Sequence, residues 1–177
     1  MVVINASALV DGLLVAGAAR ARLASDNLQA PELIDAELLS VLRRLVLAGS
    51  LAETHARQAL ATASQLGLRR YPTRTLWPRA WELRTNLSAY DALYVALAEQ
   101  LNAPLLTADT RLSRAPGLRC SVEVLEPLAT LGLDRFRLYP REGPWLPSPT
   151  CFSAIAARQC ASRRAEADHR AGRPQLG

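Results

Sequence analysis

The chain has 177 residues, half of them hydrophobic, which is enough for one domain with a substantial core. Its net charge of +5 is uneven, because residues 1–127 hold 13 arginines and 12 acidic residues whereas residues 128–177 hold 8 arginines and 4 acidic residues. Two histidines and three cysteines, without a C-x-x-C pair, exclude a zinc site and chemistries that need several imidazoles. Carboxylates are therefore the candidates for any catalysis.

The start of the chain does not resemble a targeting segment. The first basic residue is Arg20, whereas a signal peptide begins with basic residues. The longest apolar stretch, residues 6–19, is interrupted by Asp11 and is too short to span a membrane. We therefore expect a cytoplasmic protein without a membrane partner.

The first predicted element is a strand over residues 2–4, a β-branched run typical of strands buried on both faces of a parallel sheet. The strand ends at Asn5, and apolar residues at helical spacing follow from Ser7, which we predict to be the N-cap of the first helix. A polar loop at residues 25–27 leads to Pro31, which is predicted to open a second helix ending near Gly49.

The remaining elements alternate between helices and strands. We predict helices over residues 51–66 and 78–84 with a short extended piece at 68–71 between them, a helix from residue 88 to about 102, a strand at 104–107, a helical turn at 110–113 and a strand at 120–125. This alternation predicts an α/β fold with a central, mostly parallel sheet and helices on both faces. Beyond residue 127 the pattern fails, so we predict one domain over residues 1–127 and an Arg/Pro-rich extension over residues 128–177, mostly without fixed structure.

Polar side chains with oxygen atoms follow the predicted strands. Asn5 follows the first strand, Asp109 follows the strand at residues 104–107, Asp91 lies in the first turn of the helix before that strand, and Glu37 lies one turn into the second helix. Reactive groups in parallel sheets gather beyond the carboxyl ends of the strands. These four side chains can converge there, and Mg²⁺ and Mn²⁺ prefer such oxygen ligands.

Each of these residues also has a structural interpretation. Asp91, three residues after Ser88, suits a helix cap; Glu37 suits a solvated helix surface; Asp109 suits a turn, and Asn5 suits a turn or cap. Taken singly, the structural interpretations of Asp91, Glu37 and Asp109 are favoured, and Asn5 is evenly balanced. Only the combination of the four favours a metal site.

Other residues likewise have both a functional and a structural interpretation. Arginines that could contact phosphate, but equally form ion pairs or solvated surfaces, are Arg43, Arg44, Arg69, Arg70 and Arg111. Four aromatic residues at helical spacing are interpreted as core or dimer contacts in preference to base-stacking platforms: Trp77, Trp81, Tyr90 and Tyr94. Asp35 is predicted to be a first-turn helix acid and Asp11 an exposed helix residue.

Four segments carry a combined pattern: residues 3–10 (Val-Ile-Asn-Ala-Ser-Ala-Leu-Val), 36–44 (Ala-Glu-Leu-Leu-Ser-Val-Leu-Arg-Arg), 89–99 (Ala-Tyr-Asp-Ala-Leu-Tyr-Val-Ala-Leu-Ala-Glu) and 106–112 (Leu-Thr-Ala-Asp-Thr-Arg-Leu). Together they resemble the PIN-domain family, and specifically the VapC-type toxins of bacterial toxin–antitoxin pairs, over about residues 1–126. The resemblance implies a PIN-like fold and a homodimeric, Mg²⁺- or Mn²⁺-dependent endoribonuclease that cuts RNA and is silenced by a cognate antitoxin protein.

The resemblance also assigns roles to residues. The four acidic positions of the family correspond to Asn5, Glu37, Asp91 and Asp109 as metal ligands, of which the last three would be catalytic. The supporting hydroxyls of the family correspond to Ser7 and Thr107. Three of the four acidic positions thus carry an acid in this chain.

The first motif departs from the family, because it reads Ile-Asn-Ala-Ser where the pattern has Ile-Asp-Ala-Ser. An amide at position 5 removes one negative charge, so we predict weakened metal binding and slow or absent cleavage. The alternative is a catalytically silent PIN-like module that binds RNA or a protein. A phosphatase or receiver-type domain is disfavoured, because Asn5 is not the nucleophilic aspartate that such domains require.

Overall fold

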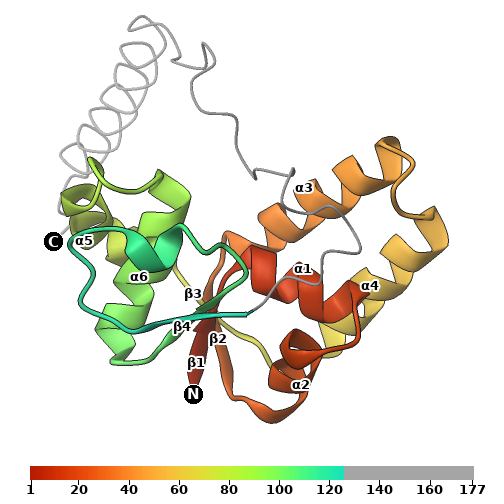
Figure 1. Cartoon of the computed structure of the whole chain (residues 1–177), viewed down its shortest axis with the longest axis horizontal. Coiled ribbons are helices and arrows are strands. Elements are labelled where there is room, and N and C mark those ends of the chain that lie inside the picture. The colour runs from red at the N-terminus through yellow and green to blue at the C-terminus, as the bar shows by residue number, and fades with distance from the viewer. Residues whose placement is uncertain (126–177) are drawn as a thin grey trace, which may run out of the picture. The chain divides into compact units, whose positions relative to one another are not determined.

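The computed structural model describes residues 1–125, which form a five-stranded sheet (Figure 1). The strands are β1 (Val2–Ile4), β2 (Leu28–Pro31), β3 (Arg69–Tyr71), β4 (Leu105–Thr107) and β5 (Val122–Val124), in the spatial order β3-β2-β1-β4-β5. Every neighbouring pair is parallel. The predicted α/β fold with a parallel sheet is confirmed, and the extension predicted over residues 128–177 lies outside the described residues.

Helices cover both faces of the sheet. Helices α1 (Ala6–Leu14), α2 (Ala18–Ser25), α3 (Ile34–Leu47) and α4 (Glu53–Gln65) lie on one face, and α5 (Trp77–Glu82) and α6 (Ala89–Leu101) lie on the other (Figure 1). Short 3-10 helices span Thr73–Leu76 (η1) and Leu112–Arg114 (η2). The chain moves from β1 to β3 in one direction and then crosses back to β4, and right-handed crossovers in opposite directions put their helices on opposite faces. Among residues 1–125, no helix combines the length and apolar character needed to cross a membrane.

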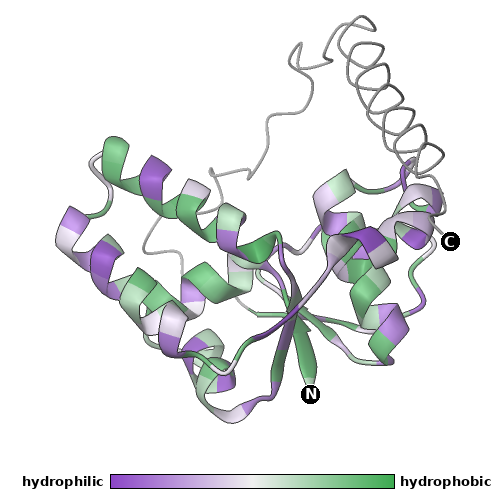
Figure 2. Ribbon diagram, turned by 180° about the vertical axis from the view of Figure 1, so that it is seen from behind, coloured by the Kyte–Doolittle hydropathy of each residue, from purple (hydrophilic) through white to green (hydrophobic). Residues whose placement is uncertain are grey.

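The core lies on both sides of the central strands. Val2, Val3 and Ile4 of β1 and Leu105 and Leu106 of β4 are all fully buried. Figure 2 shows the matching concentration of hydrophobic residues along the strands. Burial of β1 on both faces explains why its residues form a continuous apolar run without alternation.

Strand β2 differs from the sequence-based prediction, which had a polar loop followed by a helix beginning at Pro31. Gln29 in this strand is buried, its Nε2 donates to Asn27 Oδ1 (2.6 Å), and its Oε1 accepts from the Tyr71 hydroxyl (2.9 Å). The sequence Leu-Gln-Ala-Pro has little intrinsic preference for a strand. Pairing with β1 and β3 on its two sides therefore decides its conformation.

The prediction that Asp11 is exposed is wrong. The residue is only 4% exposed on α1, and its Oδ1 accepts no hydrogen bond from the part of the chain that the structure describes. Burial raises the pKa of this carboxyl group above its ordinary value. Asp11 is buried because neighbouring elements cover α1 on a side that the sequence alone leaves polar.

A glycine allows helices α1 and α2 to pack closely. A Cβ atom on Gly12 would lie 2.6 Å from Leu23 Cδ1 and 3.1 Å from the backbone carbonyl carbon of Ala19. We expect Gly12→Ala to lower the free energy of unfolding by about 1–3 kcal/mol, because the clash includes backbone. Urea denaturation measures this loss, and Gly67→Ala, whose Cβ would meet nothing within 4 Å, is the matched control. Equal stability of the two variants would contradict the packing argument.

Candidate active site

Asn5 lies at the carboxyl end of β1 and is the N-cap of α1. Its Oδ1 accepts a hydrogen bond from the backbone N–H of Ala8 (3.1 Å) and another from the Ser7 hydroxyl (2.7 Å). The prediction that Ser7 is the N-cap is therefore wrong, because the helix begins two residues earlier. The bond from the Ala8 N–H fixes the amide orientation, since only the amide oxygen can accept it.

Thr107 connects Asn5 to the Asp109 region. Asn5 Nδ2 donates to Thr107 Oγ1 (2.7 Å), which also accepts from the backbone N–H of Asp109 (3.0 Å). The Ser7 hydroxyl accepts from the backbone N–H of Ala108 (3.1 Å). Ser7 already gives its proton to Asn5, so the contact between Ser7 and Thr107 (3.4 Å) has Thr107 as the donor. The two predicted supporting hydroxyls thus hold the ends of β1 and β4 together.

Asp91 and Asp109 lie close enough to influence each other electrostatically. Burial raises the pKa of Asp91 and repulsion from Asp109 raises it further, whereas the hydrogen bond from Ser88 and the charge of Arg111 act in the opposite direction. Ser88 also accepts from the Asp91 backbone N–H (3.1 Å), so the predicted capping contact is present in the same residue.

Arg111 supplies a positive charge beside the acids. Its guanidinium pairs with both carboxylate oxygens of Asp109, including Nε to Oδ1 at 2.9 Å, and its backbone N–H donates to Oδ1 at 2.9 Å. Asp109 is therefore also the turn residue that the sequence suggested. A positive group beside Asp109 partly balances its charge and that of Asp91.

Glu37 is 2% exposed, so its interpretation as a solvated helix residue is wrong. Its Oε2 accepts a hydrogen bond from the hydroxyl of Tyr94, which lies on α6 one turn after Asp91. The sequence predicts a core or dimer contact for Tyr94, and the residue is buried in the core while its hydroxyl also donates to Glu37. The spacing of three residues from Asp91 is the signal that could have indicated it, because residues at this spacing share a helix face.

The donor set of the site suits a hard divalent cation. Within residues 1–125, no three His, Cys, Asp or Glu side chains lie close enough together to hold a metal ion, so Glu37 does not form a ready-made cluster with Asp91 and Asp109. Mg²⁺ commonly uses one or two carboxylates and retains waters or substrate phosphates as further ligands. The interacting pair Asp91 and Asp109 fits that requirement. Asn5 contributes little to metal coordination, since its Oδ1 already accepts two hydrogen bonds.

The arginines and aromatic residues considered above separate into different roles. Arg70 pairs with Asp35 in the first turn of α3 (2.7 Å), which also agrees with the interpretation of Asp35 as a first-turn acid. Trp77 and Trp81 are 58% and 70% exposed, so a role in the core is wrong for both of them. Their exposure leaves them available for contacts with other molecules.

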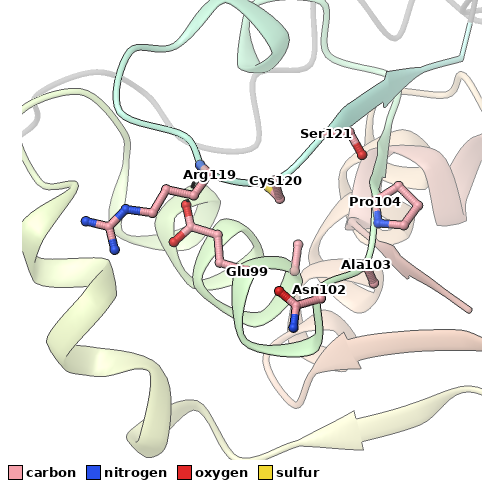
Figure 3. Close-up of a pocket in the computed structure, with 8 residues that line it drawn as sticks. Glu99, Asn102, Ala103, Pro104, Arg119, Cys120 and Ser121 are labelled. Carbon is pink, nitrogen blue, oxygen red and sulfur yellow. Dashed lines mark hydrogen bonds between the residues drawn. The ribbon is translucent and has the colours of Figure 1, made fainter.

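A cavity of about 220 Å³ lies away from these acids (Figure 3). Its lining residues include Pro104 and Ser121, which precede β4 and β5 and so mark the amino ends of the strands. Glu99 in its wall already accepts hydrogen bonds from Arg79 Nε (2.6 Å) and from the Arg119 backbone N–H (2.8 Å). Burial raises the pKa of the Cys120 thiol, which disfavours a nucleophilic thiolate. The candidate active site is therefore at the opposite, carboxyl edge of the sheet.

Comparisons with known proteins show which family the chain resembles. The family model described as PIN domain matches residues 2–118. Ribonuclease VapC9 of Mycobacterium tuberculosis is 47% identical over 125 residues, which cover 71% of this chain and 98% of that protein. Ribonuclease VapC1 of the same species is 44% identical over 128 residues, covering 70% of this chain and 96% of that protein.

A solved structure supports the fold at low sequence identity. The crystal structure of VapBC2 from Rickettsia felis, bound to a DNA fragment from their promoter, matches with a TM-score of 0.50 and 17% identity, over 70% of this chain and 98% of the matched one. Its match confirms the α/β architecture independently of the close relatives. The extent of the family match and the identity to the mycobacterial proteins show that the chain belongs to the PIN-domain family and to its VapC-type members.

Proposed function

We propose that the chain is a VapC-type endoribonuclease toxin, a hydrolase that cuts phosphodiester bonds of RNA with a divalent metal ion, Mg²⁺ or Mn²⁺. The ribonuclease names of the mycobacterial relatives support the reaction. The observation that carries the proposal is the placement of two carboxylates: Asp109 follows β4 and is joined through Thr107 to Asn5 at the end of β1, and Asp91 lies in the first turn of α6. The charge of Asp109 acts on Asp91, and a divalent cation would relieve that repulsion.

Each residue has a proposed role. Asp91 and Asp109 would hold the ion, and Glu37 would be the third catalytic carboxylate, positioned by Tyr94. A bound ion would polarise the scissile phosphate and stabilise the negative charge that develops on its oxygens. Thr107 fixes the backbone of Asp109 by accepting its N–H. Arg111 pairs with both oxygens of Asp109, so an ion held by Asp109 would displace this guanidinium, which would then be free to contact a substrate phosphate.

Asn5 weakens this site in our proposal. The family has an aspartate at this position, whose second oxygen would stand where Asn5 has Nδ2, an atom that cannot coordinate a hard cation. Because Oδ1 accepts hydrogen bonds from Ala8 and Ser7, the amide offers neither a negative charge nor an unoccupied oxygen. We therefore expect slow cleavage by the chain as it stands.

The amide at position 5 also favours a second candidate function. If Asp91 and Asp109 alone bind the ion too weakly, the chain is a catalytically silent PIN-like module that binds RNA or a protein. The Asn5 side chain donates one hydrogen bond and accepts two within this network, so the substitution costs the fold little, as a retained silent module would require.

We further propose the binding partners, the cellular location and the domain organisation of the protein. Its protein partner would be a cognate antitoxin that covers the acidic site, and exposed apolar side chains such as Leu39 and Leu47 on α3 support a homodimer. We place this activity in the cytoplasm, in a domain of residues 1–127 followed by a separate Arg/Pro-rich extension over residues 128–177.

Cleavage of an unstructured RNA by the full chain tests the proposal. We expect slow cleavage with Mg²⁺ or Mn²⁺, none with EDTA, and a loss of about 10²-fold or more in both Asp91→Asn and Asp109→Asn, because each removes a charge that would hold the ion. Asp26→Asn, the same chemical change beyond the end of α2, is the control and should cleave like the parent. Cleavage that persists in EDTA, or in both aspartate variants, would contradict the metal-dependent mechanism.

A further inference from the structure

We propose that the segment of residues 69–84, here called the basic–aromatic segment, is a docking surface for single-stranded RNA. In this proposal, bases stack on Trp77 and Trp81 while Arg69, Arg74 and Arg84 contact phosphates. The inference rests on the proposed function as a ribonuclease, and it adds the surface that would hold the substrate beside the acids.

The distribution of charge supports this surface. The basic–aromatic segment holds five arginines and one acidic residue, whereas the other described residues hold 8 arginines and 10 acidic residues. Outside the segment the described domain therefore carries a net negative charge, which repels a polyanion. RNA affinity depends on a local cluster of positive groups, because phosphates dominate nucleic-acid binding.

Three of the five guanidiniums have no acidic partner among residues 1–125, and Arg84 Nη1 donates to the carbonyl oxygen of Trp81 (2.9 Å). Arg70 pairs with Asp35, and Arg79 pairs with Glu99 and Glu82. Within residues 1–125, the exposed side chains of Arg69, Arg74 and Arg84 form no ion pair with an acid. Their positive charges are thus not neutralised by the described protein.

The two tryptophans form an exposed aromatic pair. Trp77 and Trp81 are four residues apart in the sequence of α5, a spacing that places side chains on the same helix face. The Arg84 guanidinium lies 5.2 Å from the centre of the Trp81 ring, and Arg69 lies at the same distance from the ring of Tyr71. Alternating aromatic rings and guanidiniums suit single-stranded RNA, whose bases stack on rings and whose phosphates pair with arginines.

The position of the segment connects this surface to the acids. All five strands are parallel, so the carboxyl end of β3, where the segment begins to leave the sheet, is at the same edge as Asn5 and Thr107. Helix α5 packs against α6, and the chain continues from Arg84 to Ser88 and Asp91 at the start of α6 (Figure 1). Both ends of the segment therefore lead to the candidate active site.

RNA explains this surface better than a second copy of the chain. In a symmetric dimer the same patch meets itself, which would bring the uncompensated charges of Arg74 and Arg84 towards those of the partner. RNA instead supplies the phosphates that these guanidiniums lack. Dimerisation through the tryptophans is the outcome that would replace the proposal.

Binding of a non-cleavable RNA tests the surface without depending on catalysis. The experiment uses the full chain with the substitution Trp145→Phe, so that tryptophan fluorescence comes from Trp77 and Trp81 alone. The RNA probe is a 2′-O-methyl RNA of about 12 nucleotides, and the buffer contains EDTA. We expect quenching of the fluorescence, and Trp81→Ala or Trp77→Ala to weaken binding by about 5- to 100-fold. Arg74→Gln and Arg84→Gln should each lower the slope of log affinity against log salt by about 0.7.

A variant outside the segment is the control. Arg57→Gln removes a positive charge on α4, where the side chain is 76% exposed, and it should bind RNA like the parent. The proposal is overturned if the tryptophan variants bind RNA normally, or if they change the mass in sedimentation without changing RNA affinity. Because binding is measured without metal, weakened binding in these variants supports the surface even if Asp91→Asn leaves cleavage unchanged, which would refute only the proposed catalysis.

Discussion

Replacing Asn5 by aspartate is expected to tighten Mg²⁺ or Mn²⁺ binding by about 10- to 100-fold and to accelerate RNA cleavage by at least as much. The substitution is isosteric: Oδ1 can keep its bonds from Ala8 and Ser7, and the second oxygen replaces Nδ2 opposite Thr107. The Thr107 hydroxyl can rotate to donate to that oxygen, which retains a lone pair for the ion. The substitution also adds a negative charge at the carboxyl edge of the sheet, where Thr107 joins position 5 to Asp109.

Thermal unfolding measures the same effect without an activity assay. A third carboxylate should lower the Tm of the metal-free protein, because like charges repel, and metal should raise the Tm of Asn5→Asp more than that of the parent. At a metal concentration of about 100 times Kd the stabilisation is roughly 2.7 kcal/mol.

The control for this substitution makes the same change elsewhere. Asn27→Asp is an exposed amide-to-acid replacement just before β2, at the amino edge of the sheet, and should leave metal binding and cleavage unchanged. If Asn5→Asp binds metal more tightly but still does not cleave RNA, the silent-module candidate is favoured. If the substitution changes neither property, position 5 is not part of a metal site.

The second large effect is expected at the buried ion pair between α5 and α6. Glu99 is 9% exposed and accepts hydrogen bonds from Arg79 Nε (2.6 Å), Arg79 Nη2 (3.1 Å) and the Arg119 backbone N–H (2.8 Å). Glu99→Gln should lower the free energy of unfolding by about 2–4 kcal/mol, because it removes the less exposed of the two negative charges that pair with the partly buried Arg79 guanidinium and leaves only Glu82. Urea denaturation at neutral pH measures the loss.

The pH dependence of this loss has a defined sign. Burial acts to raise the pKa of Glu99, but the hydrogen bonds and charges of Arg79 and Arg119 outweigh it and lower the pKa below the ordinary value of 4.5. A carboxylate with a lowered pKa contributes its full stability above the unfolded-state value, and this contribution is lost as the pH falls through the folded-state value. The difference between the parent and Glu99→Gln should therefore be constant above pH 4.5 and shrink below it.

An exposed pair is the control for the buried one. Glu53 pairs with Arg57 on the surface of α4, where its side chain is 66% exposed, and Glu53→Gln should cost no more than about 0.5 kcal/mol because solvent screens the pair. Similar losses for the two substitutions would show that burial is not the source of the stabilisation by Glu99.

Much of the architecture could be predicted from local sequence. The apolar run at residues 2–4 and the amphipathic pattern of α3 indicated a buried strand and a surface helix, and both are present. Helix α6 begins after Ser88, where the Ser-x-x-Asp pattern predicted it. These signals are reliable because they arise from interactions between residues that are near in the chain.

Elements whose conformation depends on distant partners could not be predicted in this way. Strand β2 contains Gln29 and Pro31, and it is a strand because β1 and β3 pair with it on both sides. The sequence offered both Ser7 and Asn5 as caps of α1, and Asn5 is the cap because the Ser7 hydroxyl is bound to Asn5 and to the backbone of Ala108, far away in the sequence. Burial of Glu37 and Asp11 likewise depends on which elements cover α3 and α1.

The sequence by itself determined the family pattern, the parallel α/β architecture and the absence of an acid at position 5, since these are properties of residue type and spacing. Only the tertiary structure decided that Asp91 and Asp109 influence each other, that Glu37 is held by Tyr94, and that both polar ends of the Asn5 amide are occupied. Hydrogen bonds and charge repulsion depend on distances of a few ångströms between residues far apart in the chain, and folding sets those distances.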